Sequence, residues 1–123
     1  MGEESRLQVV GVIGCGLMGS GIAQVCAQAG YRTIVREVDA AAVEAGLSRI
    51  EQFLEKGVSR GSVTSDLRDA TMDRLEGTTN FDALSESDLV IEAIVEHVDA
   101  KKAAFAAVEE VVSAETGVLE YGL

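Results

Sequence analysis

The chain is poor in aromatic residues and in positive charge. Aromatic residues make up 4% of its 123 residues and hydrophobic residues 47%, so its core must be built from Val, Ile, Leu and Ala, as in most buried parallel sheets. It has 10 Lys and Arg residues and 21 Asp and Glu residues, which gives a formal net charge of -11. A surface this acidic repels phosphate backbones and anionic lipids, which argues against nucleic-acid and membrane partners.

Cysteine is scarce as well, and two cysteines are too few for a disulfide framework. Cys15 and Cys26 are separated by roughly 15 Å if the intervening segment is helical, beyond the reach of a disulfide. Both are expected to be free thiols, and we interpret Cys15 as a small residue in a tight turn rather than an activated nucleophile. The sequence has no run of 18 apolar residues and no signal peptide, which predicts a cytoplasmic protein.

The length of the chain suits one domain with its own core, but it is short for a complete dinucleotide-dependent enzyme. There are no repeats, low-complexity tracts or obvious linkers. We therefore predict a single domain over residues 1–123, which is either a module or a fragment of a longer protein.

Residues 9–19 are the most informative stretch, because an apolar run there leads directly into Gly14-x-Gly16-x-x-Gly19. Gly14 permits the tight turn out of a strand, and Gly16 removes the Cβ that would block a phosphate. Gly19 lets the next helix lie close against the sheet, so that the helix N-terminus faces the anion. The pattern predicts a pyrophosphate cradle between a strand and a helix.

The residues after the glycines show two further features of a dinucleotide-binding site. Apolar residues recur at helical spacing, at Met18, Ile22, Val25, Cys26 and Ala29. A second apolar run ends at Arg36 and Glu37, and Glu37 lies 18 residues beyond Gly19, close to the spacing of a ribose-binding acid. A carboxylate there repels a 2′-phosphate and favours NAD over NADP, whereas the neighbouring Arg36 would tolerate the extra phosphate or stack on adenine.

The rest of the chain continues to alternate between strands and helices. Asp39 is the expected N-cap of an amphipathic helix that ends near Gly57, and its apolar positions are Val43, Leu47, Ile50 and Leu54. Thr64 caps a second helix that runs to residue 73, so the connection after the second strand is a helical pair. Further strands are expected at residues 75–79 and 88–93, and another begins at Val118.

One more helix is expected over residues 99–113, with Ala103, Ala106 and Val111 facing inward. The whole pattern predicts an α/β fold of Rossmann type, with a mostly parallel sheet, helices on both faces and the helical pair inserted after the second strand.

Four segments together resemble the NAD-binding domain of the L-3-hydroxyacyl-CoA dehydrogenase family, which includes 3-hydroxybutyryl-CoA dehydrogenases. They are residues 11–24, 29–31, 77–79 and 88–96. The resemblance covers nearly the whole chain. It implies reversible oxidation of a 3-hydroxyacyl-CoA to the 3-ketoacyl-CoA, with hydride passing to NAD, in fatty-acid or butyrate metabolism.

The resemblance also implies a set of cofactor-binding residues. They are Gly14, Gly16, Leu17, Met18 and Gly19 around the pyrophosphate, Glu37 at the adenosine ribose, and Ala93, Ile94, Glu96 and Lys101 at the nicotinamide end. It further implies a role for Lys56, and less so for Arg60, near the CoA moiety of the substrate. Phe53 departs from the small or polar residues common in that part of the family.

His97 is the only histidine, and a dehydrogenase of this class uses a histidine as general base. The family usually has asparagine at this position and carries its catalytic histidine after a later strand. We therefore interpret His97 as a loop residue near the cofactor and assign no catalytic residue and no metal ligand to this chain.

The resemblance ends at about Leu119, before the catalytic and dimerisation part of the family. We therefore expect the fold to be truncated after its fifth strand, and the polypeptide alone to bind NAD without turnover. An unpaired fifth strand invites self-association through its edge. Two alternatives remain open, a non-catalytic NAD-binding or regulatory module and the cofactor half of a related hydroxy-acid or sugar-acid dehydrogenase.

Overall fold

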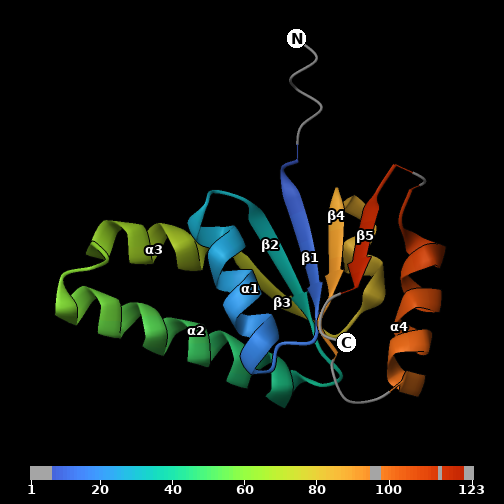
Figure 1. The fold of residues 1–123 in the computed structure, drawn as a ribbon, viewed down its shortest axis with the longest axis horizontal. Coiled ribbons are helices and arrows are strands. Elements are labelled where there is room, and N and C mark those ends of the chain that lie inside the picture. Colours follow the sequence, from blue (N-terminus) through green and yellow to red (C-terminus); the bar gives the residue numbers. More distant parts are fainter. Residues whose placement is uncertain (1–6, 95–97, 114, 121–123) are drawn as a thin grey trace, which may run out of the picture.

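The computed structural model describes residues 7–94, 98–113 and 115–120, which form a parallel five-stranded sheet in the order β3-β2-β1-β4-β5 (Figure 1). The strands are β1 (Val9–Ile13), β2 (Arg32–Arg36), β3 (Leu75–Thr78), β4 (Leu89–Glu92) and β5 (Gly117–Glu120). The helices are α1 (Leu17–Gln28), α2 (Ala40–Arg60), α3 (Ser65–Asp73) and α4 (Val98–Val111), together with a short 3-10 helix, η2 (Phe81–Glu86). The expected Rossmann-type fold with its helical pair is confirmed, whereas η2 was not expected.

Helices cover both faces of the sheet, and each face has its own hydrophobic cluster. On one side, Val12 of β1 packs in a cluster with Leu54 of α2 and with residues of α1. On the other side, Val90 of β4 packs in a cluster with Val108 of α4 and with η2. The chain moves outward from β1 to β3 and then returns to place β4 on the opposite side of β1. The strand order therefore reverses between β1 and β4, where α/β sheets of this kind leave a crevice at the carboxyl ends of the strands.

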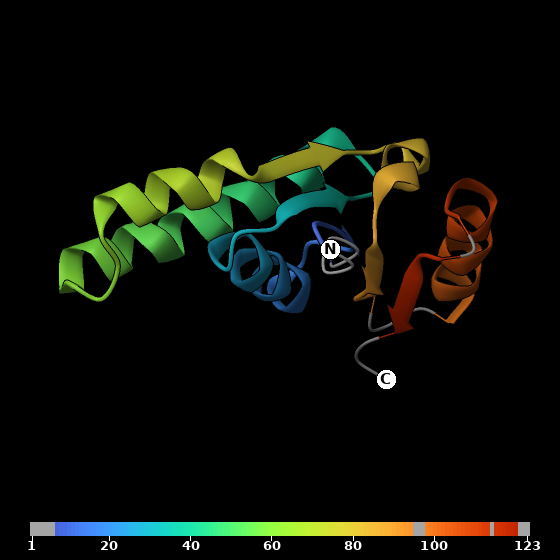
Figure 2. The same cartoon turned by 90° about the horizontal axis from the view of Figure 1, so that it is seen from above.

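Helices α2 and α3 form a hairpin that projects beyond the β3 edge of the sheet (Figures 1 and 2). The expected caps are confirmed, because the Asp39 and Thr64 side chains accept backbone amide hydrogen bonds at 2.8 Å and 3.1 Å. Helix α2 continues to Gly61, which takes the left-handed conformation with φ of 81°, so the expected end near Gly57 is wrong. Gly57 lies inside the helix. A Cβ there would lie 2.7 Å from Val63, so glycine at this position lets the turn after α2 fold back against the helix.

Helix α1 turns its smallest residues toward the sheet. Its buried residues are Gly19, Ser20, Ala23 and Ala27. Ile22 and Cys26 from the apolar stripe pack against the core, whereas Met18 and Val25 are 41% and 68% exposed, so the stripe marks the buried face only in part. The reason is the close approach of α1 to the first loop, where a Cβ on Gly19 would lie 1.7 Å from the Gly14 oxygen.

The expected inward face of α4 is wrong at two of its three positions. Ala103 and Ala106 are exposed, whereas Ala104 and Val108 are buried. The expectation is confirmed for Val111, which is half-buried and packs against the same cluster as Val108. Alanine is found on buried and exposed helix faces alike, so it does not indicate which face is buried. The buried face also begins at Lys101, and a lysine is usually expected to face solvent.

Candidate functional site

The glycine-rich loop leaves β1 at the carboxyl end of the sheet and enters α1 directly. Gly14 has φ of 94°, a conformation that favours glycine, and its amide donates to the Arg36 carbonyl oxygen at 2.9 Å. Gly16 is the N-cap residue of α1, and no described side chain caps the helix there. The first amides of α1, at Leu17 and Met18, have no intrahelical acceptor and are therefore available to an anion.

Gly16 and Gly19 differ sharply in what a side chain would meet. A Cβ on Gly16 would meet no described atom within 4 Å, so the space in front of the loop is open to a ligand. A Cβ on Gly19 would overlap the loop backbone itself. Gly16 is therefore suited to a phosphate, and Gly19 is required by the packing of helix against loop.

Glu37 follows β2 and reaches back to this loop. One carboxylate oxygen accepts a hydrogen bond from the Cys15 amide at 2.7 Å and the other from the Val38 amide at 2.9 Å. The Glu37 amide itself donates to the Thr78 carbonyl oxygen at 2.9 Å. The acid that the spacing identified therefore lies against the glycine loop, on the β2 side of β1.

Cys15 is buried in the loop, with 2% of its surface exposed. Its carbonyl oxygen accepts a hydrogen bond from Arg49 of α2 at 3.0 Å, and a Cβ on Gly46 of α2 would lie 2.2 Å from its sulfur. Burial, reinforced by the Glu37 carboxylate and opposed by the Arg49 guanidinium, raises the pKa of the Cys15 thiol to about 11. Cys15 and Cys26 are both free thiols, as expected, and Cys15 is a packing residue.

Ala93 and Ile94 lie against the other side of the glycine loop, directly after β4. A Cβ on Gly14 would lie 3.3 Å from the Ile94 side chain, and one on Gly19 would lie 3.6 Å from the Ala93 Cβ. The Ala93 amide donates to the Ile13 carbonyl oxygen at 2.9 Å. The structure therefore brings these two residues together with the glycine loop.

A buried ion pair lies behind them. Glu92, the last residue of β4, is fully buried, and its carboxylate accepts a hydrogen bond from the Ile94 amide. Its other oxygen lies 2.9 Å from the Lys101 ammonium, on the first turns of α4. The Lys101 ammonium thus lies at the carboxyl end of β4, against a carboxylate that the sequence had not singled out.

Arg36 lies on the opposite face of the sheet from α1 and α2. Its guanidinium stacks 3.8 Å from the centre of the Phe81 ring, and its Nε donates to the Thr79 carbonyl oxygen at 3.0 Å. Burial lowers the pKa of Arg36. Its guanidinium is therefore engaged by η2 and the loop after β3, and the Glu37 carboxylate also interacts electrostatically with it.

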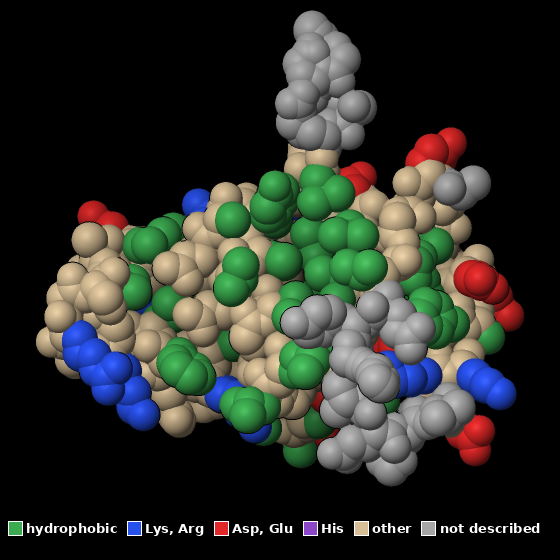
Figure 3. Space-filling view, viewed as in Figure 1, with side chains coloured by type: hydrophobic (Ala, Val, Ile, Leu, Met, Phe, Trp, Pro, Cys, Tyr) green, Lys and Arg blue, Asp and Glu red, His purple; other side chains and the backbone are tan. Residues whose placement is uncertain are grey.

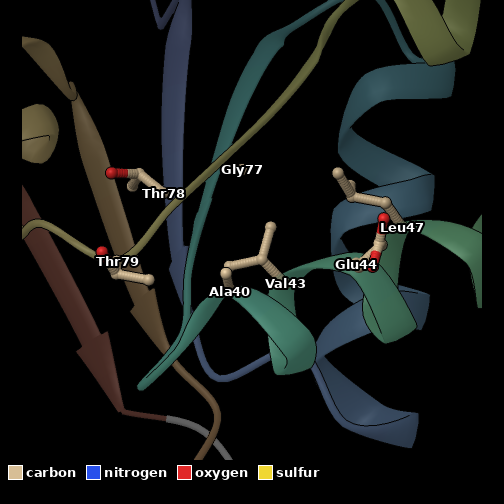
Figure 4. A pocket seen from close by; sticks show the side chains of 7 residues that line it. All are labelled: Ala40, Val43, Glu44, Leu47, Gly77, Thr78 and Thr79. Atoms are coloured by element: carbon tan, nitrogen blue, oxygen red, sulfur yellow. The ribbon is translucent and has the colours of Figure 1, made fainter.

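A shallow hollow opens between the start of α2 and the end of β3 (Figure 4). It is lined by Ala40, Val43, Glu44, Leu47, Gly77, Thr78 and Thr79. A Cβ on Gly77 would lie 2.2 Å from Val43, so this glycine lets α2 pack against β3. None of the residues assigned to the cofactor lines this hollow.

The remaining candidate residues lie away from the glycine loop or outside the described residues. Lys56 is exposed and lies 16 residues into α2, roughly 24 Å along the helix from its start. Arg60 and Phe53 are also exposed on this helix. Glu96 and His97 lie outside the described residues.

Several apolar side chains are exposed beside the glycine loop. Leu17 is 75% exposed, and with Met18 and Val25 it forms part of an apolar surface on α1. Figure 3 shows that apolar side chains gather on this face of the molecule, over α1, β1 and β4.

No helix within the described ranges combines the length and apolar character needed to cross a bilayer. In the same ranges no group of three or more His, Cys, Asp or Glu residues is arranged to hold a metal ion.

Three residues of this region were not predicted from the sequence to take part in the site. Glu92 and Phe81 looked like ordinary residues of a strand and a loop, and Arg49 looked like a solvent-facing helix residue. Only for Glu92 was there a signal, because an acid in a strand expected to be buried requires a partner.

Comparison with known proteins assigns this arrangement to a family. Residues 9–119 match the family model described as 3-hydroxyacyl-CoA dehydrogenase, NAD binding domain. A 3-hydroxybutyryl-CoA dehydrogenase of Mycobacterium tuberculosis is 45% identical over 113 residues, covering 92% of this chain and 40% of the relative. A 3-hydroxyadipyl-CoA dehydrogenase of Escherichia coli is 39% identical over 111 residues, covering 90% of this chain and 23% of the relative.

Solved structures agree with this assignment. FadB2 of M. tuberculosis superposes with a TM-score of 0.91 at 42% identity, covering 94% of this chain and 41% of that one. The (S)-3-hydroxybutyryl-CoA dehydrogenase of Ralstonia eutropha superposes with a TM-score of 0.90 at 29% identity, with the same coverage of 94% and 41%. The chain thus spans about two fifths of the length of the M. tuberculosis and R. eutropha relatives and about a quarter of the E. coli one. It belongs to the family of 3-hydroxyacyl-CoA dehydrogenase NAD-binding domains.

Proposed function

We propose that this chain binds NAD in the crevice between β1 and β4 and supplies the cofactor half of a 3-hydroxyacyl-CoA dehydrogenase. The observation that carries the proposal is the open space in front of Gly16 beside the first amides of α1. These amides face a position where a pyrophosphate can enter without meeting a side chain. On a chain with net charge of -11, such a local cradle is needed because the overall field repels an anionic ligand.

The two ends of the cofactor would contact opposite sides of the crevice. The Glu37 carboxylate is placed to accept hydrogen bonds from the adenosine ribose hydroxyls, next to the loop amides. Ala93, Ile94 and Lys101 would lie beside the nicotinamide half, and Glu96 would follow them in the chain. When bound, NAD supplies the hydride acceptor, and the chain's own residues bind and orient it.

The same geometry favours NAD over NADP. A 2′-phosphate on the adenosine ribose would meet the Glu37 carboxylate, and the Arg36 guanidinium is already engaged with Phe81 and Thr79. NADPH is therefore expected to bind more weakly than NADH. Equal affinities in a calorimetric titration of both cofactors would overturn this preference.

A pair of glycine substitutions tests NAD binding independently of folding. In Gly16→Ala the new methyl group meets no protein atom but occupies the ligand's space, so NADH affinity should fall about tenfold or more while the melting temperature is unchanged. Gly21→Ala is the matched control, because its Cβ also meets nothing within 4 Å but lies along α1 beyond the first turn. Gly21→Ala should keep NADH affinity and raise stability by up to about 1 kcal/mol. Equal NADH affinities for both variants would contradict the proposal.

The reaction of the complete enzyme is proposed from the names of the relatives. The 3-hydroxybutyryl-CoA and 3-hydroxyadipyl-CoA dehydrogenases both act on acyl-CoA substrates, so we assign the same substrate class here. In such an enzyme the exposed Lys56 would contact the CoA moiety. The chain on its own is expected to bind NAD without turnover, since we assign its only histidine, His97, no catalytic role. Oxidation of 3-hydroxybutyryl-CoA by the purified polypeptide would refute this.

We also propose self-association through β5. Within the described residues β5 pairs only with β4, and its Val118 and Leu119 side chains are 37% and 50% exposed. An apolar outer strand with open backbone groups is a template for pairing with a second copy. Sedimentation velocity should show concentration-dependent dimers, and a single monomeric species at all concentrations would exclude them.

A further inference from the structure

We propose that Glu92 is a positioning residue for the nicotinamide half of the cofactor. Its carboxylate holds both the Ile94 amide and the Lys101 ammonium at the carboxyl end of β4. The inference rests on the proposed NAD binding and names the residue that shapes the β4 side of that site.

The burial of Glu92 is the first observation behind this role. Glu92 has none of its surface exposed, and Glu92 and Lys101 are the only charged side chains buried within the described ranges. The neighbouring residues of β4 are Val90 and Ile91, so an apolar residue would suit the packing there. Buried ion pairs are commonly no more stabilising than apolar residues of similar size. The pair is therefore better explained by what it positions than by the stability that it contributes.

The position of Glu92 is the second observation. Glu92 pairs in register with Ile13, the residue that leads into the glycine loop. Its acceptor bond restrains the Ile94 amide, and the Ile94 side chain lies against Gly14. A shift of Ile94 would therefore change the β4 side of the site, next to Gly14.

The side of the crevice then identifies which half of the ligand is affected. Glu37 lies on the β2 side of β1, and Glu92 lies on the β4 side. A dinucleotide bound across the crevice with its adenosine ribose at Glu37 places its other half beside β4. Glu92 fixes the Lys101 ammonium at 2.9 Å, so this long side chain contacts the ligand without the entropy cost of being ordered on binding.

The test compares NADH with ADP on the full 123-residue chain carrying Glu92→Gln. Gln keeps the size of Glu92 and an oxygen for the Ile94 amide, but it removes the negative charge that lies 2.9 Å from the Lys101 ammonium. ADP contains the adenosine and two phosphates but lacks the nicotinamide riboside. Calorimetry should show NADH binding weakened about tenfold, whereas ADP affinity changes by less than about twofold. Equal weakening of both ligands would indicate a general structural role and overturn the inference.

Two further variants complete the experiment. Asp99→Asn is the matched control, because it neutralises an exposed acid in the first turn of α4 and should leave both affinities unchanged. If Glu92 acts through Lys101, adding Glu92→Gln to Lys101→Gln should weaken NADH binding no further, and additive losses would contradict the inference. The double variant also serves if Glu92→Gln alone does not fold, because it removes both charges together.

Failure of the inference is distinguishable from failure of the proposed function. If the unaltered chain binds neither ADP nor NADH, the crevice is not a dinucleotide site. If it binds both and Glu92→Gln leaves NADH affinity intact, the site stands and the role of Glu92 is refuted.

Discussion

The two sides of the crevice are built from different parts of the polypeptide. On the β2 side the candidate ligand-binding groups are backbone amides at Leu17 and Met18, left accessible by Gly16, with one acid placed against the loop. On the β4 side they depend on a buried pair of charged side chains, Glu92 and Lys101. A backbone cradle leaves a pattern in the sequence because only glycine suits its positions, whereas a side-chain pair leaves no characteristic spacing.

On the loop side the largest effect is expected for Gly19→Ala. The added Cβ would lie 1.7 Å from the Gly14 oxygen, so α1 must move away from the loop. We expect the free energy of unfolding to fall by about 4 kcal/mol, in the range reserved for severe overpacking, and NAD binding to be lost. Urea denaturation measures the first effect, with Gly21→Ala as control. A loss below that of an ordinary surface substitution would mean that the loop adapts to a side chain.

On the β4 side the corresponding change is Lys101→Met, which leaves the Glu92 carboxylate buried without its ammonium partner. The free energy of unfolding should fall by about 3 kcal/mol, because an uncompensated buried charge is costly. Lys102→Met at the exposed neighbouring position should change it by less than about 0.5 kcal/mol. Equal free energies of unfolding for the two variants in urea denaturation would show that the ion pair between Glu92 and Lys101 does not stabilise the fold.

A smaller effect on the loop side is the pH dependence of stability caused by Cys15. The pKa of Cys15 is raised from 9.0 to about 11 in the folded chain, so its burial contributes stability below pH 9 that is lost as the pH rises toward 11. Over that interval the free energy of unfolding should fall by about 2 kcal/mol more for the unaltered chain than for Cys15→Ala. The two pH profiles are compared by urea denaturation. Parallel profiles would mean that the thiol ionises as readily in the folded chain as in the unfolded one.

Features that depend on local chemistry could be predicted from the sequence. The strand leading into Gly14 and the caps at Asp39 and Thr64 are each set by a few neighbouring residues, and all were found where expected. The placement of Glu37 beside the loop was also predictable, because the strand and helix between them have nearly constant lengths in this kind of unit.

Features that depend on contacts between distant segments could not be predicted. Cys15 is buried because Gly46 of α2 lies against it, and the spacing between these residues carries no signal. The buried face of α4 was misplaced because its alanines suit either side, and because Lys101 is buried by its pairing with Glu92. The engagement of Arg36 by Phe81 likewise depends on η2, which has no apolar periodicity to indicate it.

The hydrogen bond between the Glu37 carboxylate and the Cys15 amide has a consequence for binding kinetics. Because this bond already ties the end of β2 to the glycine loop, the loop is preorganised before any ligand arrives. Association then requires no slow folding of the loop and should proceed in a single step, at a rate set by diffusion past an acidic surface. Added salt should therefore accelerate NAD capture by screening that repulsion, while leaving the shape of the loop unchanged.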